Sequence, residues 1–260
     1  NYRREEANMI RAENISKNYA EKKILEAIDI ELPKEKLIAF IGPNGAGKST
    51  FLSLISGLQA QSTGDIYLDQ QEIRNWRSKE LAQKLAILKQ SNGIQLNISV
   101  YDLISFGRFP YNRGKLNAED HHIIETAIAQ MELDDLKESS IHALSGGQLQ
   151  RVYIAMILAQ DTDYILLDEP LNNLDLNHAN QMMHLLKKLV EEHDKTVVIV
   201  LHDINFAAGF ADYIVAMKDG KIFAKGSTNE IIQPEVLNQL YGMNVKICEI
   251  EGKRFCMYFH

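Results

Sequence analysis

Residues 37–50 read Leu-Ile-Ala-Phe-Ile-Gly-Pro-Asn-Gly-Ala-Gly-Lys-Ser-Thr, an apolar run followed by a glycine-rich run. The apolar part is strand-sized, and residues 50–58 have the apolar spacing of a helix. The pattern GxxxxGK[ST] between a strand and a helix predicts a loop whose backbone N–H groups surround a phosphate. The alternative is a glycine-rich turn with an exposed lysine, and the complete pattern in its expected context argues against it. The stretch therefore predicts an α/β nucleotide-binding fold.

Each side chain of this loop has a predicted task. Lys48 would reach the β- and γ-phosphates of ATP, and the Ser49 hydroxyl would bind the Mg²⁺ that bridges them. The predicted nucleotide-binding residues of the loop are Gly42, Pro43, Asn44, Gly45, Ala46, Gly47, Lys48, Ser49 and Thr50.

The rest of the chain alternates strand-length apolar runs with helical patterns, which predicts a parallel sheet flanked by helices. Residues 10–32 and 64–68 predict a small antiparallel sheet, and residues 91–160 read as a helical insertion. We expect a P-loop NTPase (RecA-like) core with these two additions. The expected divisions are a disordered or vector-derived start at residues 1–8, a first core segment at 9–90, the helical insertion at 91–160, and a second core segment with a C-terminal tail at 161–260.

Two carboxylates end the apolar strand at Tyr164 to Leu167, where parallel sheets bind ligands. Asp168 would hold Mg²⁺, and Glu169 would orient or deprotonate the attacking water. Taken alone, the pair would more often be a solvated strand end. The glycine loop elsewhere in the chain favours the catalytic interpretation instead. His202 follows the next apolar strand and could contact the γ-phosphate, although a lone histidine is more often structural.

Composition limits the partners of this chain. Its net charge of −7 argues against a broad nucleic-acid or anionic-lipid footprint. Its longest apolar runs are far shorter than the roughly 20 residues that span a bilayer. Cys248 and Cys256 form no zinc-type pair, and we interpret both as reduced thiols. Any link to a membrane should therefore run through a protein partner.

Leu144-Ser145-Gly146-Gly147-Gln148 precedes a helical run and resembles the signature motif of ABC-transporter ATPases. The alternative, a flexible helix cap, is disfavoured by the position of the motif between the two halves of the predicted site. The resemblance covers nearly all of residues 10–260. It implies that Ser145, Gly146, Gly147 and Gln148 of one subunit cap the γ-phosphate held by a second copy, so that ATP drives a homodimer.

The resemblance assigns three further residues. Tyr19 is similar to the aromatic that stacks on adenine, Gln90 to the glutamine that links Mg²⁺ to the membrane-facing surface, and Asp175 to the aspartate that couples the two sites. A half-buried packing tyrosine and a surface amide are the alternatives for Tyr19 and Gln90. Leu171 departs from the family, where threonine or serine is usual after the Glu-Pro pair.

Within the family, residues 105–111 and 174–178 are most similar to ATPases of bacterial iron-siderophore importers, with haem and vitamin B12 importers sharing parts of the pattern. The resemblance implies a peripheral protein on the cytoplasmic side of the cell membrane. Its partners would be transmembrane permease subunits and, indirectly, an extracellular iron-siderophore-binding protein. Residues 107–111 could form part of the permease groove, or could be a proline-containing loop with packed aromatics.

Two other functions are open to a chain with this loop. A mechanical ATPase acting on nucleic acid or the ribosome is the first, but the short spacing from Lys48 to Ser145 and the single cassette argue against it. A nucleotide-binding regulator without turnover is the second, and Glu169 and His202 argue against it. The sequence predicts an ATPase, converting ATP and water to ADP and phosphate, that powers an importer.

Overall fold

The computed structural model describes residues 9–89, 97–112 and 114–258. The expected start at residues 1–8 and the predicted magnesium-linking Gln90 lie outside the described residues. The chain forms two compact units, one of Asn1–Trp76 with Met183–His260 and one of Arg77–Met182. We call them the loop unit, which contains the glycine loop, and the helical unit. The boundary at Met182 falls within helix α7, Leu176–His193.

The loop unit is built on strands in the order β10-β9-β3-β8. Strand β3 pairs in parallel with β8 on one side and with β9 on the other, whereas β10 pairs antiparallel with β9. Every residue of β3 and β8 is buried, which explains their continuous apolar runs. The bounds of these strands are Leu37–Ile41 for β3, Thr196–Val200 for β8, Tyr213–Lys218 for β9 and Lys221–Ser227 for β10.

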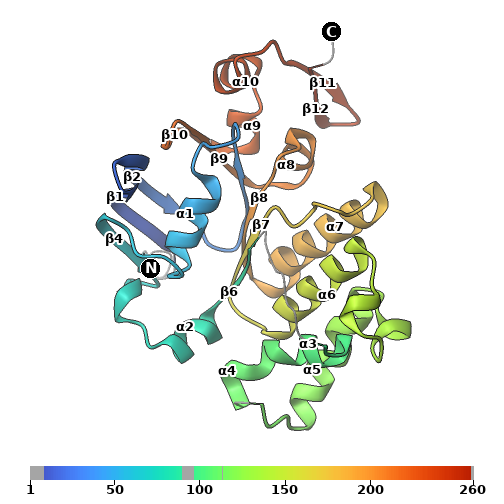
Figure 1. Ribbon diagram of the computed structural model, residues 1–260. Helices are drawn as coiled ribbons and strands as arrows, with labels where there is room; N and C mark the ends of the chain where they lie inside the picture. The colour runs from blue at the N-terminus through green and yellow to red at the C-terminus, as the bar shows by residue number, and fades with distance from the viewer. Residues whose placement is uncertain (1–8, 90–96, 113, 259–260) are drawn as a thin grey trace, which may run out of the picture. The chain divides into compact units, whose positions relative to one another are not determined.

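A second sheet of the loop unit is antiparallel, with the order β2-β1-β4-β5 (blue to teal in Figure 1). Alternating residues such as Ile28, Ile30 and Leu32 of β2 are buried, as expected where one face of a strand packs on a core. The predicted small antiparallel sheet is therefore present. Its strands are β1 (Ile10–Tyr19), β2 (Lys22–Leu32), β4 (Thr63–Leu68) and β5 (Gln71–Glu72), followed by the 3₁₀ turn η1 (Ile73–Asn75).

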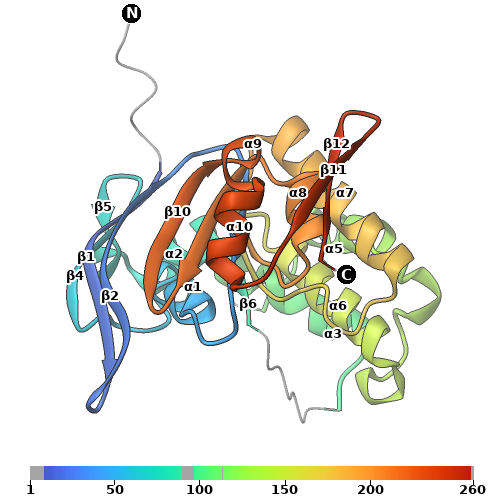
Figure 2. The same ribbon diagram turned by 90° about the horizontal axis from the view of Figure 1, so that it is seen from above.

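The C-terminal end of the loop unit folds where the sequence predicted only a tail. Strands β11 and β12 form an antiparallel hairpin beside α8 (Figure 2). The hairpin is attached to α8 because the Cys256 backbone N–H donates to Asn205 Oδ1 at 2.8 Å. The elements of this end are α8 (Ile204–Phe210), α9 (Thr228–Ile231), α10 (Pro234–Tyr241), β11 (Lys246–Ile250) and β12 (Lys253–Met257).

The helical unit contains the predicted helical insertion. Ile124, Ala127 and Ile128, which recur at helical spacing on α5, are buried and form the apolar face of this helix. The helices and turns of the unit are α2 (Ser78–Lys84), α3 (Val100–Ser105), η2 (Phe106–Arg108), α4 (Phe109–Asn112), α5 (Ala118–Gln130), η3 (Asp134–Leu136), η4 (Ile141–Ala143) and α6 (Gly146–Ala159).

Two parallel strands, β6 (Leu85–Leu88) and β7 (Tyr164–Asp168), also belong to the helical unit. Strand β7 was predicted and β6 was not. The reason is local: α2 ends at Lys84 and the backbone becomes extended at Leu85, with no turn residue between them. No periodicity separates a four-residue apolar strand from the helix that it follows.

The predicted fold class is confirmed, because buried parallel strands, a small antiparallel sheet and a helical insertion are all present. Across the described ranges, none of the helices has the length and apolarity needed to cross a membrane.

Candidate functional site

The glycine loop of the loop unit lies between β3 and α1 (Lys48–Ile55). Gly42 has a φ of 139°, and a Cβ there would lie 2.0 Å from the Met217 carbonyl oxygen of β9. Gly47 caps α1 with a φ of 97°, a left-handed conformation that side chains other than glycine rarely adopt. The glycines therefore allow the loop to pass close to β9 and to turn sharply into α1.

Lys48 is buried although it carries a charge, with only 5% of its surface exposed. Its Nζ donates to the Gly42 carbonyl at 2.7 Å and to the Pro43 carbonyl at 3.0 Å. The ammonium group is thus held inside the loop, next to the N-terminus of α1. A helix N-terminus and a neighbouring cation together attract a phosphate group.

Two distant segments hold the loop in this shape. The Gly220 N–H donates to the Ala46 carbonyl at 3.2 Å, and a Cβ on Gly220 would lie 2.3 Å from the Ile24 carbonyl oxygen. Tyr241 of α10 makes a hydrogen bond with the Gly42 backbone, and burial raises the pKa of its phenol. Neither residue was predicted, because no pattern links positions so far from the loop.

His202 lies at the same sheet edge as the loop. Strands β3 and β8 pair in parallel register at Phe40 and Val200, and the Leu201 N–H donates to the Phe40 carbonyl at 3.1 Å. His202 therefore emerges beside Gly42, as predicted from the strand order, and it is exposed. Its contact with the γ-phosphate stays a prediction.

Tyr19, the predicted adenine-stacking residue, ends β1 and is 47% exposed. Its hydroxyl donates to Gln59 Oε1 at 2.6 Å, and Lys17 Nζ lies 5.2 Å from the centre of its ring. The hydroxyl and the lysine therefore orient a ring that is about half exposed, and this is compatible both with stacking on adenine and with the alternative of a half-buried packing tyrosine.

In the helical unit Asp168 is the last residue of strand β7, whose five residues are all buried, and Glu169 follows the strand. Asp168 is 4% exposed, and Glu169 has a φ of 52°. Such left-handed residues are uncommon, and they concentrate at functional sites. Asn172 Nδ2 donates to Glu169 Oε2 at 2.8 Å, which fixes the direction of the carboxylate. The structure thus gives Glu169 a defined orientation that the sequence did not reveal.

The signature motif begins α6. Ser145 caps this helix: its Oγ accepts from the Gln148 N–H at 3.2 Å, and Gln148 Oε1 accepts from the Ser145 N–H at 2.8 Å. A Cβ on Gly147 would lie 3.1 Å from the Asn173 carbonyl oxygen. The motif is therefore a helix start with a capping box, and it lies against the loop that follows β7.

Asp175 lies in that same loop. Its Oδ1 accepts from the His178 N–H at 2.9 Å, and its Oδ2 pairs with His178 Nδ1 at 2.8 Å. The His178 backbone N–H, and then its imidazole, lower the pKa of Asp175. Leu176 beside it is 77% exposed. The predicted coupling role of Asp175 stays a prediction.

The residues predicted to bind magnesium are of types that this ion accepts as ligands. Mg²⁺ binds hard oxygen ligands, usually one or two from the protein with the rest from water and substrate phosphates. Ser49, which follows Lys48 in the loop unit, has a hydroxyl. Asp168, which precedes Glu169 in the helical unit, has a carboxylate. Gln90, the third predicted ligand, lies outside the described residues.

Comparison with known proteins now adds a family. The family model described as ABC transporter matches residues 25–172. The chain is 51% identical over 251 residues to the petrobactin import ATP-binding protein YclP of Bacillus subtilis (strain 168), covering 96% of this chain and 100% of that protein. It is 39% identical to the iron(3+)-hydroxamate import ATP-binding protein FhuC of the same strain, covering 92% and 90%.

Solved structures agree with this match. A dimeric bacterial ABC transporter cassette has a TM-score of 0.77 and 31% identity, with 85% of this chain and 99% of that chain covered. A cassette in a post-hydrolysis state bound to ADP and phosphate has a TM-score of 0.76 and 32% identity, covering 85% and 99%. A metal-chelate type ABC transporter in an inward-facing conformation has a TM-score of 0.81 at 24% identity, covering 97% of each chain, and indicates the fold.

Proposed function

Because the chain belongs to the ABC transporter family of ATP-binding subunits, we propose that it hydrolyses ATP to power import of an iron-siderophore complex through a separate permease. The loop at Gly42 to Thr50 would hold the phosphates of ATP, with Lys48 Nζ moving from the loop carbonyls to the phosphate oxygens. Tyr19 would stack on the adenine.

The chemistry would use residues of both units. Glu169, oriented by Asn172, would orient and deprotonate the attacking water, and His202 at the sheet edge would contact the γ-phosphate. Ser49 and Asp168, with Gln90, would hold Mg²⁺, which when bound neutralises charge on the phosphates. The assignment of these residues to one site rests on family membership.

Dimerisation is the second part of the proposal. The N-terminus of α6 carries Ser145, Gly146 and Gly147, and a helix N-terminus attracts an anion. We expect it to cap the γ-phosphate bound by a second copy of this chain, with Asp175 and the exposed Leu176 at the contact between the copies. A dimeric cassette among the similar structures supports this arrangement.

The proposals for the transported compound and the membrane partner rest on the similar curated proteins. The similar curated proteins are ATP-binding proteins for import of petrobactin, iron(3+)-hydroxamate and ferric enterobactin. We therefore propose a peripheral location on the cytoplasmic side of the cell membrane, with a permease and, through it, an extracellular binding protein as partners. None of these names favours the alternative of an ATPase acting on nucleic acid or the ribosome.

One observation carries the proposal: this chain is 51% identical, over the full length of the relative, to an ATP-binding protein for petrobactin import. The test is phosphate release by the purified chain with ATP, with and without Mg²⁺. We expect Mg²⁺-dependent turnover that Lys48→Ala abolishes, while exchanging Lys188, an exposed lysine on α7, for Ala leaves the rate unchanged. ATP binding without any turnover would contradict the motor function.

A further inference from the structure

The start of helix α6 packs on the segment that follows strand β7. Gln150 lies three positions after Gly147 and four after Gly146, so the three residues share one face of the helix. On this face Gly147 approaches the Asn173 carbonyl closely, and a Cβ on Gly146 would lie 3.7 Å from the Asn173 Cβ. Gln150 Nε2 donates to the Pro170 carbonyl at 3.0 Å. One face of α6 therefore contacts this segment at three positions.

Residues 169–174, which we call the glutamate segment, form two consecutive turns closed by their own backbone. The Asn172 N–H donates to the Glu169 carbonyl at 3.2 Å, and the Leu174 N–H donates to the Leu171 carbonyl at 3.2 Å. The first turn begins at Glu169 with a φ of 52°. A residue other than glycine keeps this conformation only where the surrounding structure determines it. The shape of the first turn therefore depends on contacts made to it from other elements.

Gln150 supplies such a contact from α6. Pro170, the second residue of the first turn, is buried. A proline has no backbone N–H, so the carbonyl is the backbone group through which Pro170 can be held. A buried carbonyl that loses its donor is costly, and the chain around it shifts to find another. The Gln150 amide thus ties the first turn of the glutamate segment to α6.

The same turn carries the hydrogen bond that orients the proposed general base. Asn172 Nδ2 donates to Glu169 Oε2 at 2.8 Å. Because Glu169 and Asn172 are the two ends of the turn, the direction of this bond depends on the shape of the turn. A general base must lie within hydrogen-bond reach of the water that it deprotonates, and small displacements of a catalytic group are costly. A change in the turn therefore changes the position of the carboxylate.

We propose that Gln150 is a positioning residue for Glu169 and acts through the Pro170 carbonyl. This inference rests on the proposed role of Glu169 as the general base. The Gln150 amide fixes the turn, and Asn172 at the end of the turn then holds the carboxylate in its catalytic direction. Helix α6 accordingly has two tasks: its N-terminus serves the phosphate of the second copy, and its residue 150 serves the base of its own chain.

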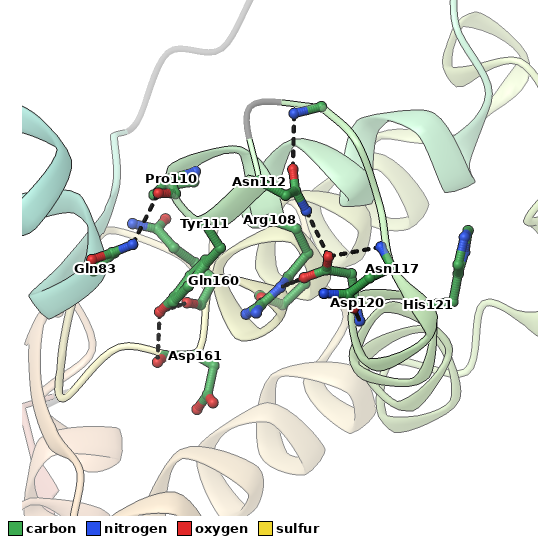
Figure 3. A network of polar contacts seen from close by, with 12 residues as sticks. Gln83, Arg108, Pro110, Tyr111, Asn112, Asn117, Asp120, His121, Gln160 and Asp161 are labelled. Carbon is green, nitrogen blue, oxygen red and sulfur yellow. Dashed lines mark hydrogen bonds and ion pairs between the residues drawn. The ribbon is translucent and has the colours of Figure 1, made fainter.

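The other end of α6 offers a matched control. Gln83 Nε2 donates to the Pro110 carbonyl at 3.0 Å, so it is also a glutamine amide bonded to a proline carbonyl (Figure 3). Figure 3 also shows the buried ion pair in which Arg108 Nε donates to Asp120 Oδ1 at 2.8 Å. Arg108 Nη1 donates to the Ala159 carbonyl, in the last turn of α6, at 3.0 Å. Removing the Gln83 amide therefore deletes a bond of the same type and length at the opposite end of the helix.

The experiment measures kcat and KM for ATP, ATP affinity and thermal unfolding of the purified full chain. Gln150→Leu removes the amide but keeps a side chain of similar size. Gln150→Glu keeps the shape of the side chain, and its ionised carboxylate cannot donate, so it tests the same bond if the leucine variant folds poorly. Gln83→Leu is the control. Each substitution is made in the wild-type chain and in a Glu169→Gln background.

The expected loss is in kcat and depends on Glu169. Gln150→Leu should lower kcat roughly tenfold and leave KM for ATP within about twofold of the wild-type value, because the loop that binds ATP is unchanged. In the Glu169→Gln background it should lower the remaining rate by less than about twofold, because residues that act as a unit have non-additive effects. Gln150→Glu should behave as Gln150→Leu does. Gln83→Leu should leave kcat and KM unchanged in both backgrounds.

Three results would overturn the positioning role alone. The first is a wild-type kcat in both Gln150 variants. The second is a loss of equal size with and without Glu169, which general destabilisation of α6 would give. The third is a loss in Gln83→Leu as large as that in Gln150→Leu. A wild-type chain without Mg²⁺-dependent turnover, or full turnover in Glu169→Gln, would instead overturn the proposed function together with this inference.

Discussion

Helices α1 and α6 both begin at segments that we propose to contact phosphate, but they begin in different ways. Helix α1 starts at Gly47 in a left-handed conformation with no side-chain cap, and a buried lysine follows immediately. Helix α6 starts at Ser145 in an extended conformation with a reciprocal capping box. The start of α1 depends on backbone conformation and on the charge of Lys48. The start of α6 depends on the side chains of Ser145 and Gln148, each of which accepts a hydrogen bond from the other residue's backbone N–H.

This difference matches the proposed tasks. A loop that holds ATP in one chain needs its N–H groups directed at the phosphates before ATP arrives. A motif that meets ATP only on dimerisation must be stable without it, and a capping box supplies that stability. The four predictions that follow test this contrast between the α1 and α6 starts, from the largest expected effect to the smallest.

Glu169→Gln should reduce turnover most. Removing a general base usually costs about a hundredfold or more in rate, and the amide keeps the size of the side chain and its partner Asn172. ATP binding at α1 and capping by α6 should then persist, so the chain should accumulate as an ATP-bound dimer. Phosphate release and size-exclusion chromatography with ATP measure the two effects. A Glu192→Gln control, exposed on α7, should behave as the wild type, and undiminished turnover in Glu169→Gln would falsify the catalytic role.

Asp120→Asn tests what supports α6 at its far end. Burial would raise the pKa of Asp120, but hydrogen bonds from Asn117, Arg108 and Asn112 outweigh it and hold the pKa below its usual value. Leaving Arg108 buried without its carboxylate should lower the free energy of unfolding by about 3–5 kcal/mol at neutral pH.

The same pair predicts a pH dependence. A depressed carboxyl pKa contributes stability above the unfolded value of about 3.9 and loses it as the pH falls through the lower folded value. The difference in unfolding free energy between wild type and Asp120→Asn should therefore shrink as the pH falls below about 4. Urea unfolding at pH 6 and pH 3 measures it. If the difference in unfolding free energy between the two proteins is the same at both pH values, the charge of the Asp120 carboxylate is not the source of the stabilisation.

Gly42→Ala and Gly45→Ala form a matched pair in the α1 start. Both glycines have positive φ, but a Cβ on Gly42 meets the Met217 carbonyl, whereas nothing lies within 4 Å of a Cβ on Gly45. Backbone strain alone costs about 1–3 kcal/mol, so Gly45→Ala should lose that much and Gly42→Ala more. Thermal unfolding and ATP titration compare the two. Equal losses would mean that close packing against β9 does not shape the loop.

Ser145→Ala should have the smallest effect on stability. Loss of an N-cap costs about 1 kcal/mol, and ATP binding to the single chain should not change, because the α1 start is intact. The ATP-dependent dimer of the Glu169→Gln background should weaken when Ser145→Ala is added. Ser139→Ala provides a control in the same unit, since that serine caps no helix. Weaker ATP binding by the monomer would contradict the division of tasks between the helices.

Local patterns were enough to predict the elements that bear the site. The glycine loop, β7 with its carboxylates, the apolar face of α5 and the start of α6 all follow from motifs or periodicity within one segment. His202 could also be placed, because parallel strands end at a common edge and its strand pairs with β3. Sequence reasoning succeeds where the cause of a structure lies within about fifteen residues of it.

Long-range contacts were not predictable in this way. Tyr241 bonds the Gly42 backbone from α10, and Gly220 bonds Ala46 from the turn after β9. Arg108 looked like part of a proline-containing loop, and only the fold brings the end of α6, at the Ala159 carbonyl, to it. Strand β6 was missed because it follows α2 without a turn. The contacts of Tyr241, Gly220 and Arg108 depend on tertiary packing, which leaves no periodic signal in the chain.

At Glu169, whose backbone is left-handed, stability and activity favour different residues. A glycine at this position would relieve the conformational cost of a non-glycine residue with positive φ, about 1 kcal/mol, but would delete the proposed base. Laboratory selection for heat resistance alone would therefore favour glycine at position 169, and the selected chains would be inactive. Thermostable variants of this protein should be sought elsewhere, and retention of glutamate at 169 in a selected library would report that activity, not only folding, was under selection.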